Sequence, residues 1–169
     1  TATIGRSTTT PKQIIATTAS GVKQPNEITK YNGNDLEPAT GSADWVVISH
    51  NSMMVSANKL AAHRASYSGL KTHIVDVADV YQQYGYGFQS PTAIKAFLAH
   101  GLAYWGLQYV VLLGDATYNP LKRSCTGVGF CPASWNTTEE TYVITDLVFE
   151  DRFTGIIPSD YPFTLLSGA

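Results

Sequence analysis

Three short apolar runs rich in β-branched residues constrain the fold of this chain more than any other feature. They are WVVISH (45–50), KTHIVDV (71–77) and LQYVVLLGDA (107–116). An apolar run this short, bounded by polar or turn-forming residues, is typical of a strand that is buried on both faces. The three runs therefore predict a sheet that must be covered on both sides.

Helical patterns lie between these runs. The segment 52–68 carries apolar residues at helical spacing, and the segment 90–106 opens with Ser90 as N-cap and Pro91 at the first helical position. The residues between, ADVYQQYGYGFQ (78–89), are crowded with Tyr and Gly and are expected to form a loop. Strand, helix, strand, helix, strand is the order of a parallel sheet with helices on both faces.

A fourth strand is predicted at TYVITDLVF (141–149), where apolar residues alternate. The fold class that follows is α/β. We expect a three-layer sandwich with a mostly parallel sheet of about four strands, a Rossmann-like half domain. Residues 44–169 should form this domain. Residues 1–43, rich in Thr, Ser, Asn and Gly, should be an N-terminal extension or wrapping segment.

The composition limits the expected partners and the expected location of the protein. The chain has 169 residues, of which only 14% are charged, and its formal net charge is −2. No large basic field exists to attract phosphate backbones, so nucleic acid is not an expected partner. No apolar run approaches the roughly 20 residues that span a bilayer. Polarity supplied by Thr, Ser, Asn and Tyr suits a secreted or cell-surface protein. The first and last stretches, TATIGRSTTT and FTLLSGA, suggest a piece of a longer chain.

Candidate functional residues fall at the ends of the predicted strands. They are His50, Asp76, Gly114-Asp115 and Asp146, and α/β folds place their chemistry beyond the carboxyl ends of their strands. Asp115 could be a reacting acid or the anchor of a turn, because an Asp after a Gly readily accepts hydrogen bonds from loop amides. The sequence has no GxGxxG, P-loop or GxSxG motif.

His100 and the two cysteines are the other candidates for nucleophilic chemistry. An apolar block followed by His100-Gly101 resembles the cysteine peptidases of the caspase-like clan, but here the block lies inside a predicted helix. Cys125 and Cys131 lie in a Gly-rich loop with no apolar strand leading into either. They could form a small disulfide-closed loop in an oxidising compartment, or remain free. A self-contained hydrolase would need His100 to activate Cys125.

The acidic stretch TDLVFED could bind a cation. Asp146 and Glu150 would lie on one face of a strand and Asp151 on the other, and oxygen ligands of this kind suit calcium. A solvated strand edge is the alternative. No cofactor is required by any other pattern in the sequence.

The order and wording of these segments resemble the gingipain-type cysteine peptidases. The matching pieces are WVVISH, AAHRASYSGLKTHIVDVADVYQQYGYG and SPTAIKAFLAHGLAYWGLQYVVLLGDATYNP, followed by CPAS and VITDLVFED. The resemblance covers about residues 44–151. It implies a caspase-like fold in which Gly114-Asp115 is an architectural turn, so Asp115 is expected to anchor a loop.

The resemblance also implies where the catalytic residues of the whole protein lie. In that family the catalytic unit has two subdomains, and the catalytic His-Gly and Cys belong to the second. No histidine or cysteine of this chain matches those positions, so the resemblance carries over no catalytic residue. We therefore expect the scaffold, or first, subdomain of a secreted cysteine endopeptidase acting on protein or peptide substrates. It would pair with a second subdomain of the same protein and would be inactive alone. The alternative is a non-catalytic binding module of a large secreted or surface protein.

Overall fold

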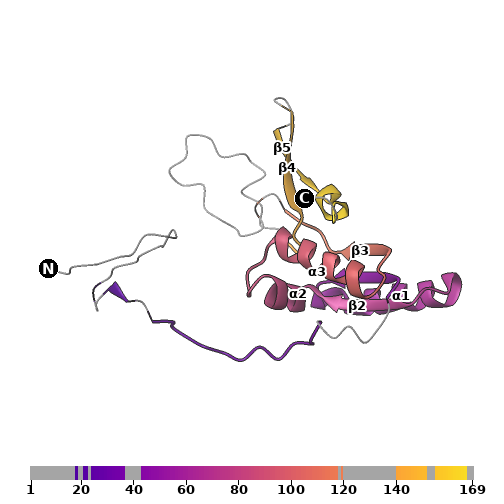
Figure 1. Cartoon of the computed structure of the whole chain (residues 1–169), viewed down its shortest axis with the longest axis horizontal. Coiled ribbons are helices and arrows are strands. Elements are labelled where there is room, and N and C mark those ends of the chain that lie inside the picture. The colour runs from indigo at the N-terminus through magenta and orange to yellow at the C-terminus, as the bar shows by residue number, and fades with distance from the viewer. Residues whose placement is uncertain are drawn as a thin grey trace, which may run out of the picture. The chain divides into compact units, whose positions relative to one another are not determined.

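A computed structural model describes residues 18, 21–22, 24–36, 43–117, 119, 140–151 and 155–166, without the side chains of 150, 151, 155 and 156. By its internal contacts the chain divides into residues 1–31 and residues 32–169. In the first unit, residues 24–31 are exposed and contain no helix or strand. The elements below belong to the second unit, drawn in Figure 1. The domain limits expected from the sequence stay a prediction.

Three parallel strands form the centre of the second unit. They are β1 (Trp45–Ser49), β2 (Thr72–Asp76) and β3 (Tyr109–Leu113), in the order β2-β1-β3. All five residues of β1 are buried because it is the middle strand and both of its faces are covered. The three strands predicted from the apolar runs are confirmed.

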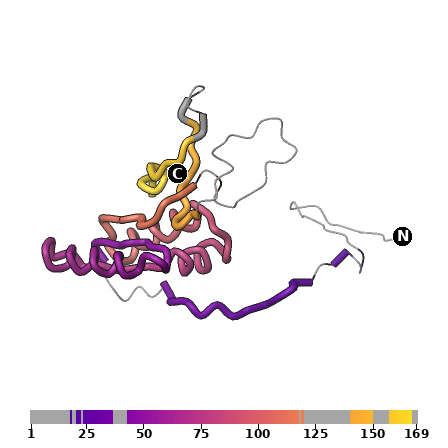
Figure 2. The backbone as a smooth tube through the Cα atoms, turned by 180° about the vertical axis from the view of Figure 1, so that it is seen from behind, coloured from indigo at the N-terminus to yellow at the C-terminus, as the bar shows by residue number. Residues whose placement is uncertain are grey.

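Helices cover the two faces of this sheet. After η2 (Asn51–Met53), α1 (Met54–Ser68) connects β1 to β2, while α2 (Val77–Tyr84) and α3 (Pro91–Tyr104) connect β2 to β3. The first connection moves outward from the middle strand and the second moves back across it. Crossovers of one hand that move in opposite directions place their helices on opposite faces. The chain path is visible from both sides in Figures 1 and 2. The three-layer α/β expectation is confirmed.

Helix α2 corrects the expectation of a loop over 78–89. Asp76 caps the helix by accepting a hydrogen bond from the Ala78 N–H at 2.9 Å, and Val77, Val80 and Tyr81 are buried at helical spacing. The many Tyr and Gly residues of 78–89 had favoured a loop over this helical pattern. The glycines belong to the turn that follows, where the amides of Gly85 and Gly87 donate to the Tyr81 carbonyl at 3.0 and 2.9 Å.

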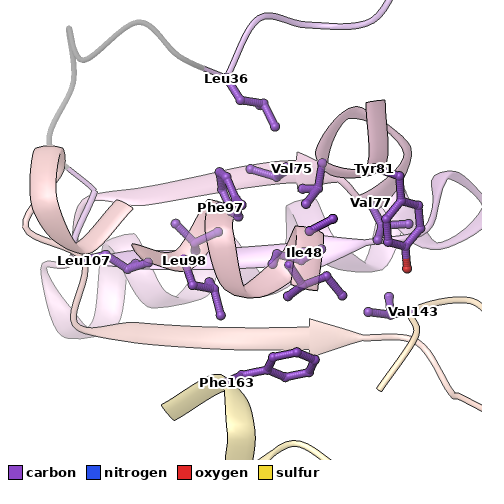
Figure 3. Close-up of a cluster of buried hydrophobic side chains, with 14 of the residues drawn as sticks. Leu36, Ile48, Val75, Val77, Tyr81, Phe97, Leu98, Leu107, Val143 and Phe163 are labelled. Carbon is purple, nitrogen blue, oxygen red and sulfur yellow. The ribbon is translucent and has the colours of Figure 1, made fainter. Parts of the chain in front are cut away.

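The core has two parts, one on each face of the sheet. On the α1 face, Trp45 and Val47 pack with Ala57 and Ala61. On the opposite face a larger cluster gathers side chains from β1, β2, α2 and α3, and from segments that follow β3 (Figure 3). Its most deeply buried large side chains are Val46, Ile48, Val75, Val80, Ile94, Phe97 and Leu98. Alternate residues of β1 therefore serve different helical layers, as the period of a strand requires.

The expected fourth strand does not join the parallel sheet. Residues 141–145 are irregular, and β4 (Asp146–Asp151) instead pairs antiparallel with β5 (Gly155–Ser159). Only residues 152–154 separate these two strands, and so short a link permits a hairpin but not a parallel crossover. The parallel sheet of the described residues therefore has three strands. After β5, the short helix η4 (Tyr161–Thr164) contributes Phe163 to the larger core cluster.

No helix in the part of the chain that the structure describes is both long enough and apolar enough to cross a membrane.

Truncation of Ile48 should test the central role of β1. Ile48→Ala removes a side chain that is 0% exposed, and we expect a loss of about 2–5 kcal/mol in the free energy of unfolding. Val55→Ala removes a side chain of α1 that is 71% exposed and should change stability by less than about 0.5 kcal/mol. Urea unfolding followed by tryptophan fluorescence measures both. Equal effects would contradict the assignment of β1 as the core strand.

Candidate functional site at the carboxyl edge of the sheet

The carboxyl ends of the three parallel strands lie at one edge of the sheet. Ser49 is in register with Asp76 on one side and with Leu113 on the other. His50 and Gly114 follow directly after β1 and β3, so His50, Asp76 and Gly114-Asp115 gather at this edge as predicted. Asp146, the other predicted strand-end residue, instead begins β4 of the two-stranded sheet. Open α/β folds bind ligands outside the carboxyl ends of such parallel strands.

His50 and Asp76 both act as caps at this edge. The Nδ1 atom of His50 accepts a hydrogen bond from the Ser52 N–H at 3.3 Å and lies 2.8 Å from the Ser52 hydroxyl. The ring also packs edge-on against Tyr142, with 5.4 Å between the ring centroids. Asp76 is the N-cap of α2, and its carboxylate accepts the Ala78 N–H. These contacts assign both residues to local structure.

Gly114 and Asp115 form a turn that brings a distant segment back to the sheet. The main-chain carbonyl of Asp115 accepts hydrogen bonds from the amides of Tyr142 at 2.8 Å and Val143 at 3.4 Å, and its Oδ1 accepts from the Ala116 N–H at 2.8 Å. Gly114 has a φ of +154°, and a Cβ there would lie 2.7 Å from the Cβ of Tyr142. The turn thus requires glycine, and Asp115 anchors a loop as expected.

The segment 142–145 packs against this carboxyl edge. Val143 and Ile144 are buried in the larger core cluster, and the Ile144 N–H donates to the Tyr81 hydroxyl at 3.1 Å. Thr145 is also buried, and its hydroxyl donates to Asp160 Oδ1 at 2.6 Å. Open α/β proteins have a crevice at the carboxyl ends of their strands. In this chain, residues 143–145 pack at that position.

A polar cavity of about 280 Å³ lies beside the Gly114-Asp115 turn. Two carboxylates, Asp115 and Asp160, contribute to its wall. The other lining residues are Leu112, Gly114, Ala116, Val143, Thr145, Pro158 and Ser159. Sequence reasoning missed Tyr81, Tyr142, Thr145 and Asp160. Recognition of α2 would have placed Tyr81 on a buried face, but no local signal links Thr145 to Asp160.

The remaining histidines do not converge on this edge. His100 lies in α3 and packs with Tyr84, Tyr104 and Trp105, at centroid distances of 5.9, 4.6 and 5.8 Å. Its buried Nε2 has no hydrogen-bond partner among the described groups. His63 stacks on Tyr67 at the surface of α1.

His73 is a further histidine away from this edge. Part of its side chain reaches solvent, but the ring packs edge-on against Trp105 at 5.3 Å, and burial of the ring lowers the pKa of His73.

The two cysteines and two side chains of the acidic stretch lie outside the part of the chain that the structure describes. Cys125 and Cys131 lie outside the described residues, so the disulfide and the pairing of His100 with Cys125 stay predictions. Asp146 begins β4, and its Oδ1 accepts from the Leu147 N–H at 2.8 Å. The side chains of Glu150 and Asp151 are not described, and the calcium site stays a prediction. Among the described side chains no group of three or more His, Cys, Asp or Glu residues could hold a metal ion.

A parallel sheet with helices on both faces, closed at its carboxyl edge by a Gly-Asp turn, places this domain in the three-layer α/β class. The solved structure of dimeric latent PorU from Porphyromonas gingivalis is similar, with a TM-score of 0.59 and 20% sequence identity. The match covers 74% of this chain and only 12% of that one. At this identity the likeness supports the fold alone. No match was found among the curated proteins.

Residues 39–169 match the model of peptidase family C25. The chain therefore belongs to the gingipain-type cysteine peptidase family, and the resemblance drawn from its strand and turn motifs is confirmed.

Gly114→Ala should destabilise the closed edge. The added Cβ would lie 2.7 Å from the Cβ of Tyr142, which is too close for two carbon atoms, and the backbone at this position has a φ that favours glycine. We therefore expect the free energy of unfolding to fall by about 1–3 kcal/mol. Gly106→Ala is the matched control, because its φ is +72° but no atom lies within 4 Å of the new Cβ. If chemical denaturation shows Gly106→Ala to be as harmful as Gly114→Ala, steric closure is not the reason for the glycine.

The Tyr81 hydroxyl should make stability depend on alkaline pH. Burial raises the pKa of Tyr81 to about 12 from 10.0, although the hydrogen bond from Ile144 opposes this shift. The folded chain therefore holds this proton at a pH where the unfolded chain releases it. Stability is fully present below pH 10 and falls as pH rises toward 12.

Tyr81→Phe provides the comparison. It removes the titrating group, but it leaves the buried Ile144 N–H unpaired, so we expect a loss of about 1–3 kcal/mol at neutral pH. The stability gap between wild type and variant should narrow in urea unfolding series between pH 9 and pH 11. A gap that stays constant over this range would show that Tyr81 does not titrate with folding.

Proposed function

We propose that this chain is the scaffold subdomain of a secreted or surface-exposed C25 cysteine endopeptidase, whose catalytic Cys-His pair lies in another part of the same protein. Membership of the family supports the reaction class. In that reaction a histidine-assisted thiolate attacks a peptide carbonyl and forms an acyl-enzyme, which water then hydrolyses. The chain spans only 12% of the length of the similar solved structure, so activity and substrate belong to the proposal.

The carboxyl edge of the sheet is the observation that carries this proposal. A catalytic edge needs an open crevice in which a nucleophile and a base meet a substrate carbonyl. Here Val143 and Ile144 are buried against the strand ends, and His50 is held by Ser52 and Tyr142. An edge closed by its own chain is suited to supporting a neighbouring subdomain.

His100 also supports a scaffold role. Its ring contacts Tyr84, Tyr104 and Trp105, and it lies in the carboxyl-terminal half of α3, the part of the helix that leads to the amino end of β3. An aromatic enclosure favours a packed imidazole over one that exchanges protons with a thiol and a substrate.

Active-site labelling of the full-length protein tests the proposal. A peptidyl acyloxymethyl ketone, which alkylates activated thiolates, should label a cysteine outside residues 1–169, and peptide mapping by mass spectrometry should locate it. Residues 1–169 expressed alone should remain unlabelled and should not cleave a fluorogenic peptide library.

Two variants of the full-length protein serve as controls. Cys125→Ala and His100→Phe should leave the rate of labelling and kcat/KM within about twofold of wild type, since neither residue would take part in the reaction. Loss of activity in Cys125→Ala, or a label on Cys125, would contradict the proposal and support a self-contained hydrolase. A full-length protein that no thiol probe labels would support the binding-module alternative.

A further inference from the structure

An extended segment of the chain, residues 32–36, lies against α2 and is held there by side chains of the helix. The main-chain N–H of Asn34 donates to Asp79 Oδ1 at 3.3 Å, and its side-chain amide donates to Asp79 Oδ2 at 3.1 Å. The Leu36 N–H donates to Gln83 Oε1 at 2.7 Å, and Gln83 Nε2 donates to the Asn34 carbonyl. Partners in these bonds are 45 to 49 residues apart in the sequence.

Leu36 is the apolar anchor of this segment. Its side chain is 4% exposed and belongs to the larger core cluster, whereas the described residues from 24 to 35 are all exposed. Figure 3 shows Leu36 directed toward Val75 of β2 and Phe97 of α3. One leucine enters the core from a stretch that is otherwise at the surface.

The contacts have the form of peptide recognition. Asp79 and Gln83 are four residues apart, so they lie on one face of α2. Gln83 bonds both a carbonyl and an N–H of the extended main chain, while Asp79 bonds a main-chain and a side-chain N–H of the same residue. Asp79 is only 3% exposed, and a buried carboxylate needs such donors. Asn34 and Leu36, two apart in an extended segment, face the same side.

We infer that Asp79, Gln83 and the apolar surface beneath Leu36 form a binding site for an extended peptide with an amide side chain two residues before a leucine, and that Asn34–Leu36 of the same chain occupies it as a displaceable ligand. The inference is independent of the peptidase proposal, because it concerns α2 and β2 and no catalytic group. The site holds residues 32–36 against α2 of the α/β domain.

Cleavage of the connection tests whether the segment binds as a ligand. A protease recognition sequence is inserted between residues 38 and 41 of the full chain, and the purified protein is cut. The N-terminal piece should co-elute with the domain at high micromolar concentration. A synthetic peptide of residues 30–38 added in excess should displace it. The uncut protein should elute as a monomer, with its segment bound in cis.

Peptide variants test the chemistry of the site. Asn34→Asp is isosteric but places a second carboxylate against Asp79, and Leu36→Ala removes the apolar anchor. Each should raise the peptide concentration needed for displacement at least tenfold. Lys30→Ala, at an exposed position, should displace like the wild-type peptide within twofold.

A variant of the domain gives the reciprocal test. Gln83→Glu still accepts from the Leu36 N–H but cannot donate to the Asn34 carbonyl, so it should weaken retention of the N-terminal piece about tenfold. Its thermal unfolding in the uncut chain shows whether α2 is intact.

Four results would overturn the inference. They are separation of the piece at every concentration, retention of the piece against excess peptide, equal displacement by all peptides, and a wild-type dimer that exchanges its segments.

Discussion

Burial of β1 on both faces is the constraint on which the other features depend. A strand with no exposed residue needs a neighbour on each side and a helical layer above and below, and β2, β3, α1, α2 and α3 supply these. Each large side chain of β1 that leaves water contributes about 1.5–3 kcal/mol, and this gain opposes the conformational entropy lost when the chain is ordered. Because the strands run parallel, their carboxyl ends must meet at one edge.

That edge is where the protein departs from an open α/β binding site. Gly114 permits the turn, Asp115 receives the amides of the returning chain, and Val143 closes the core. The same residues that a catalytic interpretation would select are engaged in holding the fold.

Sequence reasoning succeeded where a signal was local and strong. The three parallel strands, helix α3 with its Ser90 cap, and the Gly-Asp turn all followed from residues within a few positions of one another. It failed at α2, where Gly85 and Gly87 of the following turn masked a short apolar face, and at 141–149, where alternation predicted a strand of the main sheet. Alternation specifies that a strand has two unlike faces, but not which strand it pairs with.

Thus the sequence by itself determined the fold class, the order of the parallel strands along the chain and the family, because short apolar runs and turn residues act through near neighbours. Only the tertiary structure decided that Ile144 bonds Tyr81, that Thr145 bonds Asp160, and that Asn34 and Leu36 rest on α2. These contacts join residues separated by 15 to 63 positions. Their formation depends on the packed sheet that brings the partners together, and no local pattern encodes it.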